Sequence, residues 1–154
     1  MAILDRMTTF SDAQVVTTTA ISTNVLDTNN TGSPNATKDL GIGDGNQGVT
    51  VNVLVPVAFA GGTSIQINLE SSAADTLTSP TVHWASPVIP LASLTQGAIL
   101  ARVPLPAGNY LRYMGLRYTV VGTMTGGGAV DAFLTKSSGE VGTPRPYASG
   151  FAVA

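Results

Sequence analysis

Hydrophobic and polar side chains alternate along two neighbouring runs, residues 49–59 and 64–70. The odd positions of both runs are apolar: Val49, Val51, Val53, Val55, Val57, Phe59, Ile65, Ile67 and Leu69. A period of two places successive side chains on opposite faces of a β-strand. Gly61 and Gly62 separate the runs and can adopt the positive φ that a tight reversal needs. The pattern therefore predicts two strands paired as one β-hairpin.

A second pair of alternating runs follows at residues 110–121 and 129–135. The even positions are apolar: Tyr110, Met114, Leu116, Tyr118, Val120, Val130, Ala132 and Leu134. Arg112 interrupts the first of these faces, and its long stem allows the charge to reach water. The three glycines at 126–128 lie between the runs. The same reasoning predicts a second hairpin.

Shorter segments complete the expected fold. Residues 15–27 are rich in β-branched side chains, which favour two short strands or one long bent strand. Residues 81–84 and 98–103 are expected strands, and residues 90–97 allow one helical turn at most. About eight short strands with almost no helix indicate an all-β, jelly-roll-like β-sandwich, with a small barrel as the second choice. A parallel α/β fold is excluded because it needs crossover helices.

The two ends of the chain differ from this pattern. We expect one β-sandwich domain over residues 1–135, with a lead-in at 1–12 that could act as an arm, and an extended tail at 136–154. The tail is rich in Gly, Ser and Pro, and its apolar residues are isolated. It is therefore expected either to be disordered or to dock on a neighbour. The hypothetical interface residues are Ile3, Leu4, Met7, Phe10, Tyr147, Phe151 and Val153.

Charge is scarce in this chain. Charged residues make up 10% of the sequence, with a formal net charge of −2, against roughly 25% charged residues in ordinary soluble proteins. We infer that much of the surface is Ser, Thr, Asn and Gly, and that other protein covers part of it. A Thr-rich β-domain that is free in solution is the alternative.

The same composition argues against two classes of partner. The seven Lys and Arg residues are scattered, with no basic run to neutralise a phosphate backbone, so nucleic acid is not expected. The longest apolar run, residues 49–60, is too short to span a bilayer as a helix and contains Asn52 and Pro56. Residues 1–10 lack the order of a secretory signal. We therefore expect no membrane partner.

Residues that could support catalysis or metal binding are few. The chain has no cysteine and one histidine, His83, which excludes a two-histidine metal site and indicates a structural residue at a strand end. The two glutamates, Glu70 and Glu140, give no positive sign of a paired-carboxylate glycosidase. The glycine-rich stretch 40–48 is better read as a turn than as a nucleotide or calcium loop. We expect no enzyme activity and no cofactor or metal.

Aromatic residues leave one alternative open. Trp84, Tyr110, Tyr113 and Tyr118 could form a platform on which a sugar stacks, as in a carbohydrate-binding β-sandwich, a lectin-like domain or a fibre module. Such residues are more often core or interface anchors.

Five stretches carry a family resemblance: FSDAQVVTTTAISTNVLD (10–27), KDLGIGDG (38–45), FAGGTSIQINLESS (59–72), LPAGNYLRYMGLRYTVVGTMTGGGAVDAFL (105–134) and YASGF (147–151). Together they resemble the capsid cement, or decoration, proteins of tailed bacteriophages. The resemblance spans nearly the whole chain.

This resemblance implies a jelly-roll-like structural protein on the outer surface of the virion. It would clamp neighbouring subunits of an HK97-like major capsid protein and form a homodimer or homotrimer. A tail or connector component of the same particle remains an alternative, because it too would be a low-charge β-protein that assembles with neighbours.

Overall fold

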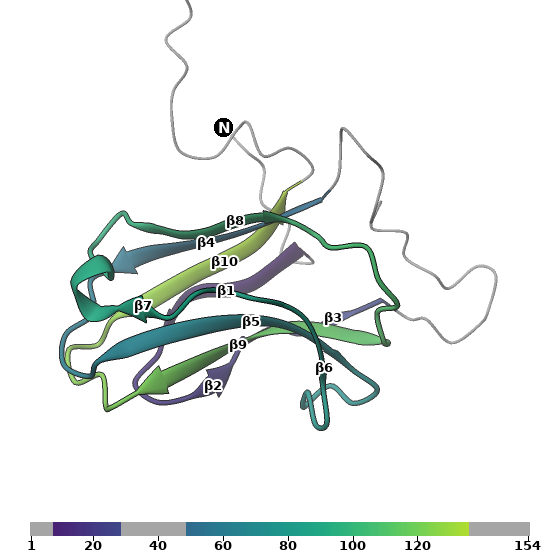
Figure 1. Ribbon diagram of the computed structural model, residues 1–154, viewed down its shortest axis with the longest axis horizontal. Coiled ribbons are helices and arrows are strands. Elements are labelled where there is room, and N and C mark those ends of the chain that lie inside the picture. The colour runs from purple at the N-terminus through teal and green to yellow at the C-terminus, as the bar shows by residue number, and fades with distance from the viewer. Residues whose placement is uncertain (1–7, 29–48, 136–154) are drawn as a thin grey trace, which may run out of the picture.

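The computed structural model describes residues 8–28 and 49–135, which form a sandwich of two antiparallel β-sheets (Figure 1). The strands are β1 (Thr9–Val15), β2 (Ala20–Ile21), β3 (Leu26–Asp27), β4 (Thr50–Val57), β5 (Ser64–Ser72), β6 (Thr81–Ala85), β7 (Ile89–Pro90), β8 (Ile99–Pro104), β9 (Tyr113–Val121) and β10 (Ala129–Thr135). A short 3-10 turn, η3 (Leu91–Ser93), confirms the single helical turn expected between residues 90 and 97.

The strand order is that of a jelly roll. Sheet A has the order β1-β10-β4-β8, and sheet B has the order β2-β9-β5-β6, with β3 also pairing with β9 and β7 with β5. β2 with β3 forms one interrupted strand and β6 with β7 another, which leaves eight strand positions in two sheets. The expected all-β sandwich is confirmed. The segment 15–27 supplies the end of β1 and two short strands.

The two predicted hairpins are wrong. β4 lies in sheet A and β5 in sheet B, while β9 lies in sheet B and β10 in sheet A. β4 pairs with β10, and β5 pairs with β9, so each glycine-containing connection carries the chain from one sheet to the other. A period of two shows which face of a strand is apolar, but it does not show which strands pair. Consecutive strands with apolar faces can lie side by side in one sheet or face each other across a sandwich, and here they face each other.

The alternating apolar positions do form the core. The buried side chains between the sheets include Val51, Val53 and Val55 of β4, Ile65, Ile67 and Leu69 of β5, Met114, Leu116 and Tyr118 of β9, and Val130, Ala132 and Leu134 of β10. Full burial of one such aliphatic side chain contributes about 1.5–3 kcal/mol. The core therefore explains why the two sheets stay together.

Four connections cross between the sheets at one end of the sandwich, which we call the crossover end: residues 16–19, 58–63, 91–98 and 122–128. Met124 N–H donates to the Thr17 carbonyl (3.0 Å), and Thr125 N–H donates to the Ala60 carbonyl (2.9 Å). Gly122 has a φ of 83°, and a Cβ there would lie 3.0 Å from the Gly62 Cα, so this close approach requires glycine. The described stretches begin and end at the opposite end of the sandwich (Figure 1).

Candidate functional site

Phe10 is the one predicted interface residue within the described part of the chain. It lies in β1 and is fully buried in the core. Residues 9–12 of the expected lead-in therefore belong to a strand, and Phe10 is a core residue rather than part of an arm. The reason is local: β1 pairs with β10 through two register shifts, which hide its alternation in the sequence. The other predicted residues, Ile3, Leu4, Met7, Tyr147, Phe151 and Val153, lie outside the described residues.

The second register shift of β1 is a bulge that redirects its side chains. Ser11 pairs with Ala132 and Gln14 with Val130, so that Asp12 and Ala13 together oppose Asp131. Ala13 has a φ of 45°, which is unfavourable for a residue with a side chain. Its N–H donates to Asp131 Oδ1 at 2.6 Å, and this charge-assisted bond holds the bulge.

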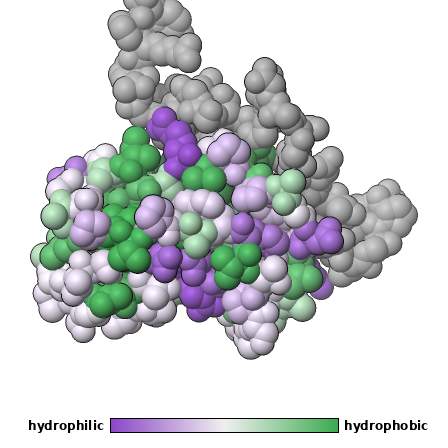
Figure 2. All heavy atoms as spheres, viewed as in Figure 1, coloured by the Kyte–Doolittle hydropathy of each residue, from purple (hydrophilic) through white to green (hydrophobic). Residues whose placement is uncertain are grey.

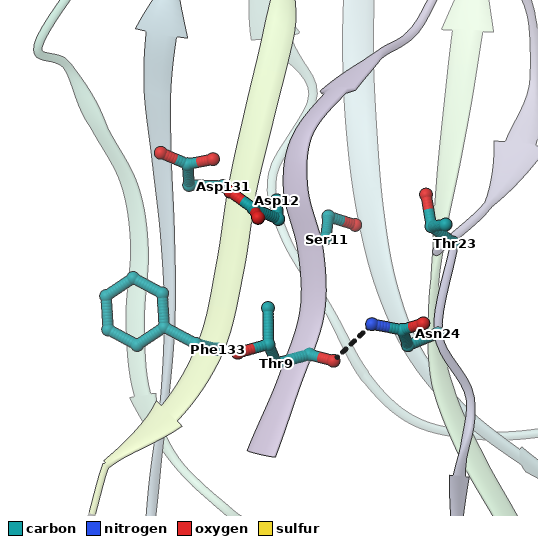
Figure 3. Close-up of a pocket in the computed structure, with 7 residues that line it drawn as sticks. All are labelled: Thr9, Ser11, Asp12, Thr23, Asn24, Asp131 and Phe133. Atoms are coloured by element: carbon teal, nitrogen blue, oxygen red, sulfur yellow. Dashed lines mark hydrogen bonds between the residues drawn. The ribbon is translucent and has the colours of Figure 1, made fainter. Parts of the chain in front are cut away.

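A pocket of about 460 Å³ surrounds this bulge (Figure 3). It is lined by Thr9, Ser11, Asp12, Thr23, Asn24, Asp131 and Phe133. Asp131 and Phe133 come from β10, whereas Thr23 and Asn24 come from the connection between β2 and β3 on the other side of β1. The bulge therefore brings together side chains from three separate parts of the chain.

A network of polar groups holds the pocket wall in place. Ser11 Oγ donates to Gln14 Oε1 (2.7 Å), which also accepts the Thr23 N–H (2.8 Å). Because the Ser11 proton is used there, the Tyr118 hydroxyl is the donor in its 2.8 Å bond to Ser11 Oγ. Burial raises the pKa of Tyr118, so this donor keeps its proton at neutral pH. The network ties β1 to the core strand β9.

The pocket was not anticipated from the sequence. Asp131 is the one charged residue in the otherwise mainly apolar run 129–135, at a position that alternation places on the outer face. Such a residue is the signal that could have indicated a site. Asp12 carries no comparable signal, because the bulge that places it beside Asp131 is not visible in the sequence.

The outer face of sheet B is arranged differently, because a loop of residues 73–79, the Leu77 loop, covers part of it. Leu77 is 1% exposed and packs over Gly115, where a Cβ would lie 2.9 Å from Leu77 Cδ1. Arg117 binds both carboxylate oxygens of Glu70 through Nε (3.0 and 2.8 Å) and donates to the Leu77 carbonyl (3.0 Å). The ion pair and the loop thus stabilise each other.

A second ion pair lies at the edge of sheet B. Arg112 donates from Nε and Nη2 to the two oxygens of Asp27, each at 2.9 Å. Both side chains are 39% exposed, and the guanidinium also lies 5.0 Å above the centre of the Tyr113 ring. The hydrogen bonds to Asp27 raise the pKa of Arg112. Arg112 therefore reaches a partner at the sheet edge, as expected for a long side chain.

The half-buried His83 and the buried Ser71 form a polar pair that resembles a base and a nucleophile. His83 Nε2 lies 2.7 Å from Ser71 Oγ, and its ring stacks on Tyr110 at 3.8 Å. Ser71 is fully buried and already accepts the Leu111 N–H at 3.0 Å. Burial lowers the pKa of His83 and raises that of Tyr110 to about 12. The pair ties the 105–112 connection to sheet B, in keeping with a structural role for His83.

The four aromatic residues do not form a shared exposed platform. Tyr118 is fully buried, and Tyr110 is 7% exposed. Trp84 packs against the core, and Tyr113 lies beneath Arg112. The stacking surface suggested by the sequence is therefore absent from these four positions.

Exposed large apolar side chains gather toward the crossover end: Val15, Val57, Val88, Ile99 and Val121, each 45–62% exposed. Val15 and Val57 are both register partners of Ala129, and Val121 pairs with Ser64. Figure 2 shows hydrophobic patches concentrated on the half of this face that carries β7 and the start of β8. Isolated exposed valines are ordinary, but a group at one end of a domain is typical of a contact surface.

Residues 8–28 and 49–135 contain no group of three or more His, Cys, Asp or Glu placed to hold a metal ion. None of the helical structure described in these ranges has the length and apolar character needed to cross a bilayer.

The strand order and the core thus define a jelly-roll domain. A family model described as Bbp16 matches residues 10–134, which runs from β1 to β10 and covers more than half of the chain. The chain therefore belongs to the Bbp16 family, which is phage-related. A search of curated proteins found no match.

Proposed function

We propose that this protein is a structural component of a phage virion. In this proposal it binds the outer surface of the head and cements neighbouring subunits of an HK97-like major capsid protein. The phage-related family supplies the context. The observation that carries the proposal is the crossover end, where five apolar side chains are exposed on a low-charge domain. Apolar side chains that gather on one face favour attachment to another protein.

A jelly-roll domain suits this role, because stabilising a head requires binding and no catalysed reaction. A protein that binds only the assembled head stabilises it by mass action. If two separate surfaces each contact a subunit, the second contact forms at a high effective concentration, so modest interfaces suffice. We assign one contact to the crossover end. We assign the other to the terminal segments that adjoin Thr8 and Thr135 at the opposite end, with a homodimer or homotrimer as the bound form.

Co-sedimentation with heads that lack the protein tests this function. We expect saturable binding at a fixed ratio to capsid subunits and a gain in the heads' resistance to heat. Absence of saturable binding would overturn the proposal. A glycan screen tests the carbohydrate-binding alternative, for which we expect no binding because Tyr110 and Tyr118 are buried. Binding to purified tails instead of heads would favour the tail or connector alternative.

Matched variants test the crossover end. Val57→Asp with Val121→Asp places two charges among the exposed apolar side chains and should weaken head binding at least about tenfold. Val82→Asp is the control, because Val82 is similarly exposed (50%) but pairs with Glu70 toward the other end of β5. Equal binding by the double variant and the control would remove the crossover end from the interface.

A deletion tests the C-terminal tail. Removal of residues 144–154 should weaken head binding or oligomerisation without unfolding the sandwich, because the described core ends at β10. Unchanged binding would exclude the tail from the contact.

A further inference from the structure

We propose that the pocket at the β1 bulge receives a lysine or arginine side chain from the capsid subunit on which the protein docks. This inference rests on the proposed function for the identity of the donor. It rests on the pocket itself for the chemistry of the ligand.

The pocket offers hydrogen-bond acceptors and few donors. Asp131 uses Oδ1 to accept the Ala13 N–H, while no described hydrogen bond occupies Oδ2. Asn24 donates from Nδ2 to the Thr9 carbonyl, which leaves its side-chain oxygen available. Asp12 adds a second, exposed carboxylate. An ammonium or guanidinium group brings several donors and no acceptor, so it complements this lining.

The charge of the pocket points to the same ligand. The described residues include five acids, of which Asp27 and Glu70 are paired with Arg112 and Arg117 on sheet B. Asp12 and Asp131 both line the pocket, no described ion pair involves either, and no described lining residue is basic. A cation that binds between these carboxylates therefore gains charge-assisted hydrogen bonds with both.

Two other ligand classes fit less well. A sugar presents donors and acceptors together and would leave its acceptors poorly matched here. A metal ion would find only two carboxylates, and the described chain holds no larger acidic group. The volume of about 460 Å³ falls in the range of about 300–1,000 Å³ typical of small-ligand sites. Phe133 also lines the pocket and adds an apolar group that the stem of a long side chain can contact.

The site is also held ready for binding. Gln14 Nε2 donates to the Ile21 carbonyl (2.8 Å) and its Oε1 accepts from Ser11 and Thr23, so β1 is joined to the segment of β2 and β3 that lines the pocket. Side chains that are already ordered lose little freedom on binding. The unfavourable φ of Ala13 is kept by its bond to Asp131, as is common where a bulge aims a side chain at a ligand.

The first experiment needs no capsid. Agmatine, which carries a guanidinium and an amine on a short alkyl chain, is titrated into the full-length protein and followed by backbone NMR. We expect shifts at Asp12, Asn24 and Asp131 that vanish in Asp12→Asn and persist in Asp75→Asn, a matched charge change in the exposed part of the Leu77 loop. No shift at the pocket, or a stronger response to a panel of monosaccharides than to agmatine, would overturn the cation assignment.

The second experiment uses the heads. Asp12→Asn should bind about tenfold more weakly than wild type and with a smaller dependence on salt, whereas Asp75→Asn should match wild type. If wild type binds and Asp12→Asn binds equally well at every salt concentration, the inference fails while the proposed function stands. If wild type does not bind heads, the proposed function fails, and with it the capsid subunit as donor; the agmatine titration still decides the chemistry of the pocket.

Discussion

The outer faces of the two sheets use their acidic residues in opposite ways. On sheet B, Glu70 and Asp27 each bind an arginine, and the Leu77 loop covers one of these pairs. On sheet A, Asp12 and Asp131 line a pocket without a described basic neighbour. In a chain with so few charges, this difference separates acids that serve folding from acids available for binding.

The two pairs of sheet B differ from each other as well. The side chain of Glu70 is 3% exposed and that of Arg117 27%, whereas both members of the Asp27–Arg112 pair are 39% exposed. Removing one partner of a buried pair leaves an uncompensated charge, while water solvates an exposed one. The comparison therefore predicts a ranked set of effects.

The largest effect should come from Arg117→Met, which leaves the Glu70 carboxylate buried without its partner. We expect a loss of about 3–5 kcal/mol in the free energy of unfolding, measured by urea denaturation. Arg112→Met is the matched control. It should lower the free energy of unfolding far less, because water still solvates the Asp27 carboxylate. Replacing Glu70 and Arg117 together with apolar residues should recover much of the loss. Equal destabilisation by the two single variants would contradict the distinction.

The next effect tests whether the Leu77 loop is part of the fold of sheet B. Leu77→Ala removes a 1% exposed side chain that packs over Gly115 and should cost about 2–5 kcal/mol in the same measurement. Val82→Ala, at a 50% exposed position, is the control. A loss below about 0.5 kcal/mol, the range of ordinary surface substitutions, would show that the loop adds nothing to stability.

A smaller effect concerns pH. Because burial lowers the pKa of His83 in the folded state, the unfolded state binds the proton more readily. Stability from this group is fully present above its ordinary pKa of about 6.5 and is lost as pH falls through the lowered pKa of the folded state. Thermal melts between pH 8 and 5 (about the range in which histidine titrates) should show this loss. In His83→Gln the melting temperature should depend less on pH over this range, whereas Asp12→Asn should keep the dependence of wild type. If Asp12→Asn removed the dependence and His83→Gln kept it, the titrating group would lie on sheet A.

The smallest effect should come from Asp12, the exposed acid of the pocket. Asp12→Asn should leave the free energy of unfolding within about 0.5 kcal/mol of wild type, because Asp12 is exposed and makes no described ion pair. Asp131→Ala should cost about 1–3 kcal/mol, because the Ala13 N–H loses a carboxylate partner. A thermal melt of each variant measures both. A large loss in the free energy of unfolding for Asp12→Asn would show that Asp12 stabilises the fold, and would contradict the distinction drawn between the acids of the two sheets.

Much of the fold was accessible from alternation alone. The strand regions other than β1 and β7, the turn near residue 91 and the apolar faces of β4, β5, β9 and β10 all follow from the order of side chains. The candidate site was not accessible, because Asp12 and Asp131 are 119 positions apart in number (131 minus 12) and meet only through the β1–β10 pairing.

The amino-acid order alone shows which side of each of β4, β5, β9 and β10 faces the core and where glycine lets the chain reverse. A period of two and a positive φ are local properties, so they can be read from neighbouring residues. The tertiary structure decided which strands are neighbours. It placed β4 and β5 in opposite sheets, buried Phe10 and built the pocket around Asp12 and Asp131. Those outcomes depend on how two apolar faces cover each other, which is settled only when distant strands pair.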